Sequence, residues 1–391
     1  MKPTRSTWLV AAALLGLAAG CGGDGGGVGP RSAGSFSVVS GGNNVPDRFS
    51  SDLWVKGSWA YTGTWGRAPR NGLRGDAVKI WSLDASGAPT LADSIMTPGV
   101  YNVSDVQASD DGSVLVFSTE GGTNAGLYVY SLSDPRAPTF LDSALVADGI
   151  HTATVADLDG HRYVFAARNP KSPALLVYDI TAPASIALVA TVPIPPAYGI
   201  HDTYVRDGLA FVFAWNTGVI IYDVGDGRRG GSPANPVEIS RLLTADDNVP
   251  GGPSVHNGWW FHNPARNESR YLFIGQEGAG VVGAESSGDL HVVDVFDIEH
   301  PKEVAFFHLD GAGTHNFWVD ESRQILYMAY YNGGVVALDV SGQLLGNLSN
   351  RLIAQIKPGG DDDTYTWGVQ LANGSLYAID MLSGLWQLKV P

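Results

Sequence analysis

Short apolar stretches recur along the chain, and none has the 3.6-residue spacing of an amphipathic helix. Residues 199–224, for example, read GIHDTYVRDGLAFVFAWNTGVIIYDV. This stretch holds an alternating segment, a turn at Asp207-Gly208, an aromatic segment and a β-branched segment. Gly, Pro and Asp separate such segments throughout the chain. The pattern therefore predicts many short strands joined by tight turns.

The pattern of residues 199–224 occurs seven times, at intervals of roughly 50 residues. Each copy starts its first strand at an anchor position, and the seven anchors are Ser51, Ser104, His151, His201, His256, His315 and Trp367. The third strands are the most alike, among them VKIWSL (78–83), LLVYDI (175–180) and VIIYDV (219–224). A fourth segment such as PVEISRL (236–242) completes a copy. Four short strands per repeat are typical of a β-propeller blade.

The third strands are apolar on both faces, as expected for a sheet packed between two neighbouring blades. The last copy ends at Pro391 directly after its third strand, LWQLKV, so it lacks a fourth. The segment SFSVV (35–39) precedes the first copy and has no partner there. We therefore predict an all-β fold over residues 34–391. It is a single seven-bladed β-propeller of four-stranded antiparallel blades, closed by an N-terminal strand that completes the last blade and covers its free edge.

The third-strand pattern, with an upstream His-Asp such as His201-Asp202 and a downstream Asp-Pro, resembles the LVIVD repeat. This repeat occurs in surface propellers of bacteria and archaea, including the choice-of-anchor proteins. The resemblance covers nearly all of residues 35–391 and is best in the third to sixth copies. The first two copies have Ser in place of His, and the last has Trp367 and Gln387 where others have His and Asp. The resemblance implies a propeller at the cell surface and no particular reaction.

The N-terminus has the features of a bacterial lipoprotein signal. Residues 1–20 carry two positive charges, an apolar run from Trp8 to Ala19 and small residues that lead to Cys21, the single cysteine of the chain. The apolar run is too short for an ordinary membrane span. We predict a signal peptide over residues 1–20, acylation of Cys21 (with palmitate among the acyl chains) and a Gly-rich tether over 21–33. A cleaved secretory signal with an incidental cysteine is the alternative.

The net charge of −15 bears on partners and location. A surface this acidic repels phosphate backbones, so nucleic acid is not an expected partner. Anionic lipid headgroups are disfavoured as well, apart from a covalent anchor. The expected location is the bacterial cell envelope, at the outer membrane or cell surface. The expected partners are the membrane, through the lipid anchor, and an envelope protein or glycan.

Propeller symmetry brings the anchor positions together around the central channel. Four consecutive blades then place their histidines in an arc at one mouth of the channel, namely His151, His201, His256 and His315. Neutral imidazoles near carboxylates are ligands for Zn²⁺, Cu²⁺ or Fe²⁺. The arc is therefore a candidate metal site. The alternative is that each histidine forms a hydrogen bond to the neighbouring blade, a structural role that would recur with the repeat.

Five further residues are candidates for ligand binding. Asp202, Asn257 and Asn316 directly follow three of the anchor histidines. Trp259 and His262 belong to the stretch HNGWWFHNPARNES, which replaces a tight turn with a longer polar loop. Its aromatic residues suit either packing between blades or stacking against a sugar or other planar ligand.

The four repeats with an anchor histidine also carry an aspartate near the end of the third strand: Asp179, Asp223, Asp294 and Asp339. The first and third strands run parallel, the histidine begins one and the aspartate ends the other. The two should therefore lie roughly 15 Å apart, at ~3.3 Å per residue. We predict that each aspartate caps the turn into the fourth strand through backbone N–H groups.

Two function classes follow from the sequence. The first is a non-enzymatic, lipid-anchored interaction platform for protein or glycan. The second is a metal-dependent enzyme, a hydrolase or an oxidase, that uses the histidine arc. Convergence of at least three of the imidazoles on a common point would favour the metal hypothesis, because Zn–N bonds are near 2 Å.

Overall fold

A computed structural model describes Arg31 and residues 33–42, 46–84, 88–169, 171–194, 199–245, 252–278 and 280–391. The predicted signal peptide (1–20), Cys21 and most of the predicted tether lie outside the described residues. Within the part of the chain that the structure describes, no helix is long and apolar enough to cross a membrane.

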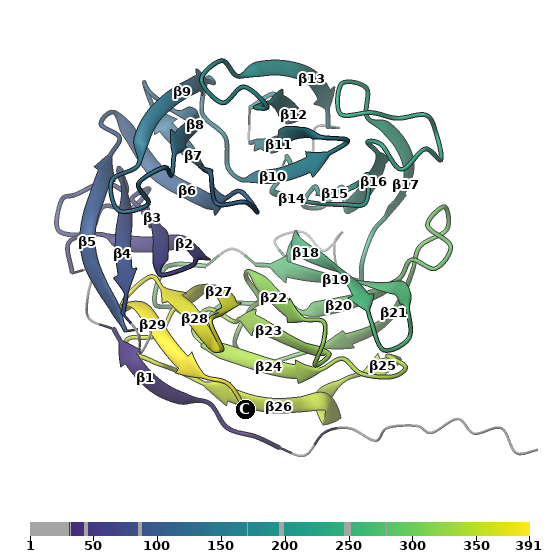
Figure 1. Cartoon of the computed structure of the whole chain (residues 1–391). Coiled ribbons are helices and arrows are strands. Elements are labelled where there is room, and N and C mark those ends of the chain that lie inside the picture. The colour runs from purple at the N-terminus through teal and green to yellow at the C-terminus, as the bar shows by residue number, and fades with distance from the viewer. Residues whose placement is uncertain are drawn as a thin grey trace, which may run out of the picture.

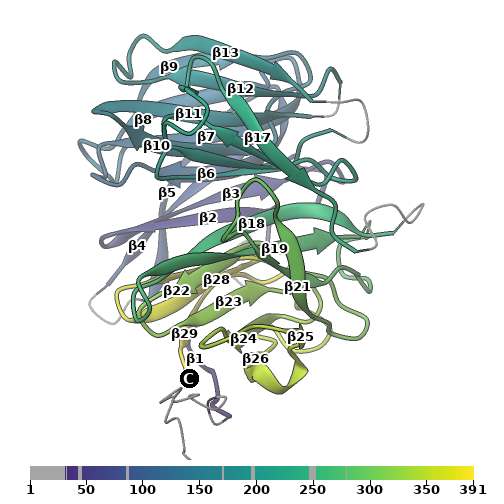
Figure 2. The same cartoon turned by 90° about the vertical axis from the view of Figure 1, so that its right-hand side faces the viewer.

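Seven antiparallel sheets surround a central axis, as Figure 1 shows face-on and Figure 2 from the side. The first three blades are β2 (Phe49–Lys56), β3 (Trp59–Trp65), β4 (Ala77–Leu83) and β5 (Pro89–Met96); β6 (Val100–Ala108), β7 (Val114–Gly122), β8 (Gly126–Ser131) and β9 (Thr139–Leu145); and β10 (Ala153–Leu158), β11 (His161–Arg168), β12 (Ala174–Asp179) and β13 (Ala187–Pro193). The fourth and fifth are β14 (Asp202–Arg206), β15 (Leu209–Phe213), β16 (Val219–Asp223) and β17 (Val237–Leu242); and β18 (Ser254–Asn263), β19 (Glu268–Glu277), β20 (Leu290–Asp294) and β21 (Lys302–Phe307). The last two are β22 (Phe317–Asp320), β23 (Ile325–Ala329), β24 (Val335–Asp339) and β26 (Leu352–Ile356); and β27 (Thr366–Ala372), β28 (Ser375–Asp380), β29 (Gly384–Lys389) and β1 (Ser37–Gly41). This architecture confirms the predicted all-β, seven-bladed propeller.

Two short elements depart from the plain repeat. The two-residue strand β25 (Gly346–Asn347) pairs in parallel with the edge strand β21 of the fifth blade. A single 3₁₀ turn, η1 (Ser349–Arg351), follows it and leads into β26. Both lie in the connection between the third and fourth strands of the sixth blade, and they cover part of an exposed sheet edge.

The predicted closure by an N-terminal strand is confirmed. Strand β1 pairs antiparallel with β29, with Ser37 opposite Lys389 and Gly41 opposite Trp386. In Figure 1 the purple strand β1 lies beside the yellow β29, close to the C-terminus. The paired segment starts two residues later than the predicted 35–39, because Phe36 turns its side chain into the core against Tyr327.

The hydrophobic core lies between blades. Every residue of β15 and β16 in the fourth blade is buried. On one face Val212 and Ile220 pack against the third blade, and on the other Phe211 and Ile221 pack against the fifth. This two-sided burial explains why the central strands read as continuous apolar runs.

The third-strand aspartates cap turns as predicted. Asp223 accepts hydrogen bonds from the backbone N–H groups of Gly225 (2.9 Å), Asp226 (3.0 Å), Arg229 (2.7 Å) and Gly231 (3.1 Å). The equivalent carboxylates accept bonds from backbone N–H groups two residues on, namely Asp179 from Thr181, Asp294 from Phe296 and Asp339 from Ser341. Asp223 is therefore saturated by backbone donors, and among the described residues no hydrogen bond or ion pair joins it to His201.

Candidate metal centre

The four anchor histidines converge near the central axis. Their ring centroids are 4.2 Å apart for His151 and His201, 3.7 Å for His201 and His256, and 4.2 Å for His256 and His315. All four side chains are buried. His151, His201 and His315 stand just before an inner strand, and His256 is the third residue of β18. The repeat itself therefore brings the imidazoles together.

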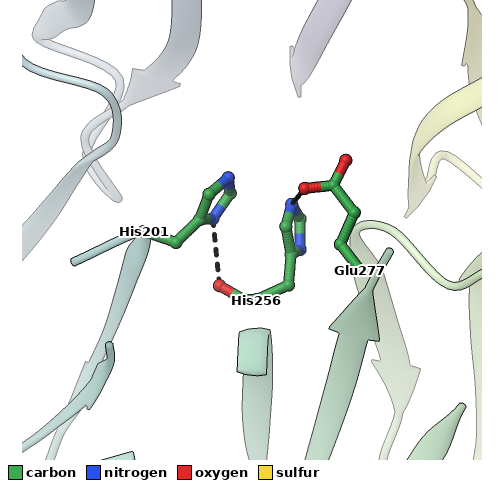
Figure 3. A group of neighbouring side chains, drawn as sticks. All are labelled: His201, His256 and Glu277. Atoms are coloured by element: carbon green, nitrogen blue, oxygen red, sulfur yellow. Dashed lines mark hydrogen bonds and ion pairs between the residues drawn. The ribbon is translucent and has the colours of Figure 1, made fainter. Parts of the chain in front are cut away.

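Two of these histidines also form a hydrogen bond to the neighbouring blade, the structural role that was the alternative to metal binding. Nδ1–H of His201 donates to the carbonyl of His256 at 3.0 Å, and Nδ1–H of His315 donates to the carbonyl of Trp367 at 2.6 Å. Figure 3 shows the first of these bonds. With Nδ1 protonated, a neutral imidazole presents a lone pair at Nε2. The structural contact thus fixes the tautomer that a metal ion requires.

Other side chains make the same contact to an anchor carbonyl where no anchor histidine makes it. Ser118 donates to the carbonyl of His151 (2.6 Å), Thr152 to that of His201 (2.7 Å) and Asn257 to that of His315 (3.0 Å). Consecutive blades are therefore linked at the level of the histidines. The imidazoles sit on a braced scaffold and not on free loops.

The contact between His151 and His201 is unusually close. Their Nε2 atoms are 2.6 Å apart, and two lone pairs at that distance would repel unless a proton lay between them, so one nitrogen donates and the other accepts. Nδ1 of His151 lies 2.8 Å from a carboxylate oxygen of Glu120, which also accepts a hydrogen bond from Ser104 at 2.9 Å. A carboxylate behind an imidazole is the arrangement that orients histidine ligands in metal sites.

Glu277 completes the cluster. The ligand atoms of His201, His256 and Glu277 all lie within 4.8 Å of one another, so these residues could hold a metal ion. Figure 3 shows the Glu277 carboxylate turned toward His256, with one oxygen 3.6 Å from Nε2. Within the described part of the chain, no hydrogen bond of normal geometry reaches either ring nitrogen of His256. Tyr331 donates its hydroxyl to the other oxygen of Glu277 and holds the carboxylate in place.

Burial sets the charge state of the cluster. It lowers the pKa of His256 to about 3, and together with the neighbouring imidazoles it lowers the pKa of His201 and of His315 well below the ordinary value. Burial also raises the pKa of Glu277. His151 differs: burial opposes its charge, but the Glu120 carboxylate outweighs burial and raises its pKa. Three neutral imidazoles are thus available as electron-pair donors at neutral pH.

Two aromatic residues press on the cluster from strained backbone positions. Trp215 and Tyr331 have φ of +48° and +40°, a left-handed conformation that is uncommon for bulky side chains. The Trp215 ring lies 4.6 Å from that of His201, and the Tyr331 ring lies 4.8 Å from that of His315. Backbone strain of this kind concentrates at functional sites.

Three predicted ligand-binding residues lie one position further along the inner strands. Burial and the charge of Asp105 raise the pKa of Asp202 to about 7. The amide group of Asn257 serves the bond between blades described above. Asn316 donates to Asp52 at 2.8 Å across the seventh blade, where Gly368 leaves room: a Cβ there would lie 2.9 Å from the Asp52 oxygen.

The structure places Trp259 and His262 away from the histidines. Both lie further along β18, and six extended residues separate His262 from His256 by roughly 20 Å. Glu321 of the sixth blade accepts hydrogen bonds from the indole of Trp259 (3.3 Å) and the backbone N–H of His262 (3.0 Å), and it pairs with Arg206. The five predicted ligand-binding residues therefore belong to two separate regions of the channel.

Sequence reasoning missed Glu120, Glu277 and Tyr331. Each stands close to the end of a second strand: Glu120 two residues before the end of β7, Glu277 at the end of β19 and Tyr331 two residues after the end of β23. An acidic residue that ends an otherwise apolar strand, as in YLFIGQE (271–277), is the signal that could have identified the two glutamates. Their nearness to the histidines depends on the packing of blades around the axis.

No protein-family model matches the chain, and no curated protein matches it significantly. The fold defines the class: a seven-bladed β-propeller, which is compatible with an interaction platform. The resemblance to the LVIVD repeat rests on the sequence motifs alone.

Proposed function

We propose that this propeller binds one divalent transition-metal ion at its centre, through His201, His256 and Glu277. The observation that carries the proposal is the convergence of these three ligand atoms within 4.8 Å. Nε2 of His151 lies 2.6 Å from Nε2 of His201 as a hydrogen-bond partner, and a metal ion on His201 would replace this contact.

The donor set favours a catalytic ion. Two imidazoles and one carboxylate, with water in the remaining position, form the ligand set of many catalytic zinc sites. When bound, such an ion would supply activation of water for a hydrolase, or electron transfer for an oxidase if it were Cu or Fe. The Glu120–His151 pair and the two bonds from Nδ1 to carbonyls orient the imidazoles.

Metal analysis tests this proposal. The purified protein is stripped with a chelator, loaded separately with Zn²⁺, Cu²⁺ or Fe²⁺, dialysed and analysed by mass spectrometry of the elements. We expect about one equivalent of at least one of these metals in the wild type and a loss of at least about tenfold in His201→Ala/His256→Ala. His161→Ala, which changes an exposed histidine on β11, is the matched control.

Glu277→Gln provides a second variant that keeps an acceptor for Tyr331, in case the double variant fails to fold. Equal and negligible metal in the wild type and the double variant would contradict the proposal.

The cell-envelope setting is part of the same proposal. The sequence of residues 1–21 supports a lipoprotein anchored through Cys21, and the repeat pattern supports a surface propeller of the LVIVD type. Strand β1 starts about sixteen residues after Cys21. A Gly-rich tether of that length would let the propeller stand about 20 Å from the membrane.

A second candidate function is binding of an envelope glycan about 10 Å further along the channel, three residues after the anchor positions. Four half-buried aromatic residues form an arc there, with ring centroids 5.2 Å apart for Tyr204 and Trp259, 5.3 Å for Trp259 and Trp318, and 6.1 Å for Trp318 and Trp54. Aromatic arcs suit stacking against sugar rings. This observation favours the interaction platform.

We expect Trp259→Ala to weaken binding of a glycan, identified on a glycan array, by several-fold, because one stacking contact contributes about 1 kcal/mol. Phe140→Ala, on the exposed outer strand β9, should leave the affinity unchanged. A wild-type protein that retains no glycan on the array would contradict this candidate.

A further inference from the structure

The connection between β3 and β4 of the first blade carries an unusual charge pattern. Residues 66–75 read GRAPRNGLRG, with three arginines and no acid, in a chain that has 39 acidic and 24 basic residues. Arginines elsewhere commonly pair with carboxylates, as Arg162 does with Asp157 and Arg270 with Asp294. Among the described residues, no ion pair joins Arg67 to a carboxylate, and its side chain is exposed. A cation left unpaired in such an acidic protein calls for an anionic partner.

Arg67 lies at the histidine end of the channel. Its guanidinium stacks over the Trp65 ring at 5.7 Å, the Trp65 ring lies 5.4 Å from that of Trp367, and the Trp367 ring lies 4.2 Å from that of His315. A continuous series of ring contacts thus joins Arg67 to the histidine cluster. The charge of Arg67 also acts on Glu120. Burial raises the pKa of the Glu120 carboxyl, but the charges of His151 and Arg67 outweigh burial, so the pKa is lowered.

Residues 66–75, which we call the arginine loop, are held in place by contacts within the loop and with Tyr101. Arg74 donates to the carbonyls of Gly66 (3.0 Å) and Arg67 (3.2 Å), and its guanidinium packs over the Tyr101 ring at 4.3 Å. Gly66 and Gly75 cross so closely that a Cβ on Gly66 would lie 1.9 Å from the nitrogen of Gly75. The loop therefore presents Arg67 in a fixed place, which reduces the entropy lost when a ligand binds.

We propose that the metal centre takes a ligand with an oxyanion group, a phosphate or a carboxylate, and that Arg67 recognises this group at the mouth of the channel. The inference rests on the proposed function. A divalent ion held by neutral imidazoles and one carboxylate keeps a net positive charge and attracts an anion. The excess of acidic residues elsewhere repels anions. Arg67 offers its planar fork of N–H donors, which matches both oxyanions, and the rings of Trp65 and Trp367 join it to the cluster.

Anion titration of the Co²⁺-loaded protein tests the inference, since the visible spectrum of bound Co²⁺ reports on its ligands. Inorganic phosphate and acetate are titrated separately into the wild type, Arg67→Gln and the control Arg136→Gln, an exposed arginine paired with Asp134. We expect Arg67→Gln to weaken anion binding about tenfold, the effect of about 1.4 kcal/mol. Arg136→Gln should bind like the wild type, and the spectrum without anion should be the same in all three proteins.

The two titrations distinguish the sources of the oxyanion, because the anion that binds more tightly identifies the class of ligand. Arg67→Lys keeps the charge and loses the fork, so it should bind with intermediate affinity. Equal anion affinity in the wild type and Arg67→Gln would overturn the inference and leave the metal site in place. Failure of the wild type to bind Co²⁺ as well as Zn²⁺, Cu²⁺ and Fe²⁺ would overturn the proposed function, and this inference with it.

Discussion

At the scale of single residues, a central histidine of this propeller uses its two ring nitrogens differently. In His201 and His315, Nδ1 links one blade to the next, and Nε2 of His201 meets Nε2 of His151 within the cluster. The structural role and the metal role are therefore compatible. The repeat accounts for the hydrogen bond between blades. It does not account for the carboxylates of Glu120 and Glu277, which lie beside the histidines.

Asp223 is the residue for which stability should depend most clearly on pH. Burial raises its pKa, but hydrogen bonds from backbone N–H groups lower it by more, to about 2. A pKa below that of the unfolded chain stabilises the fold at pH above about 4, and this contribution is lost as the pH falls toward 2. Asp223→Asn should therefore lower the free energy of unfolding by roughly 2 kcal/mol at pH 7.

Urea denaturation at several pH values between 7 and 3 measures this effect. Asp179→Asn is the matched control. Among the described residues, Asp179 accepts a backbone hydrogen bond from Thr181 alone, so the loss of stability should be smaller. Equal unfolding free energies for Asp223→Asn and the wild type at pH 7 would contradict the assignment.

At the scale of elements, each blade buries both faces and leaves its outer strand at the surface. The seventh blade is completed by β1, which comes from the other end of the chain. This pairing ties the two chain ends together and removes a free edge from β29. Phe36, 8% exposed, fills a space between the sixth and seventh blades.

Loss of this closure should destabilise the whole propeller. We expect deletion of residues 34–40 to lower the melting temperature of the entire domain in a single transition, and Phe36→Ala to cost about 3 kcal/mol. Val39→Ala is the control, because Val39 is 49% exposed. If calorimetry showed an unchanged main unfolding transition and only a small additional transition at lower temperature, β1 would not stabilise the whole propeller.

At the scale of the whole molecule, an acidic propeller of net charge −15 has little electrostatic attraction to anionic lipid. Association with a membrane would therefore depend on the predicted acyl chains. The same charge makes the arginine loop of the first blade the local exception on the surface.

Acylation can be checked directly in a bacterial expression host. We expect metabolic labelling with a palmitate analogue to mark the wild type and not Cys21→Ser, since Cys21 is the single cysteine of the chain. The mass of the N-terminal peptide should show the acyl chains. A wild-type protein without the label would contradict the lipoprotein prediction and favour an ordinary secretory signal.

The sequence by itself determined the blade repeat, the closing strand and the turn-capping aspartates. These features depend on local patterns, such as two-sided apolar strands and turn residues, which recur about every fifty residues. It also placed the four histidines in one arc, because equivalent positions of a propeller meet at its axis. Trp259 and His262 were grouped with His256 only because they are near in sequence, and the extended β18 carries them away.

Tertiary structure decided the composition of the site. Glu120, Glu277 and Tyr331 reach the histidines from a different strand of each blade, and Arg67 approaches from the first blade through a series of aromatic contacts. These distances follow from sheet twist and from how seven blades pack around one axis. No local pattern encodes them, because the residues that meet at the centre are separated by up to several hundred positions in the chain.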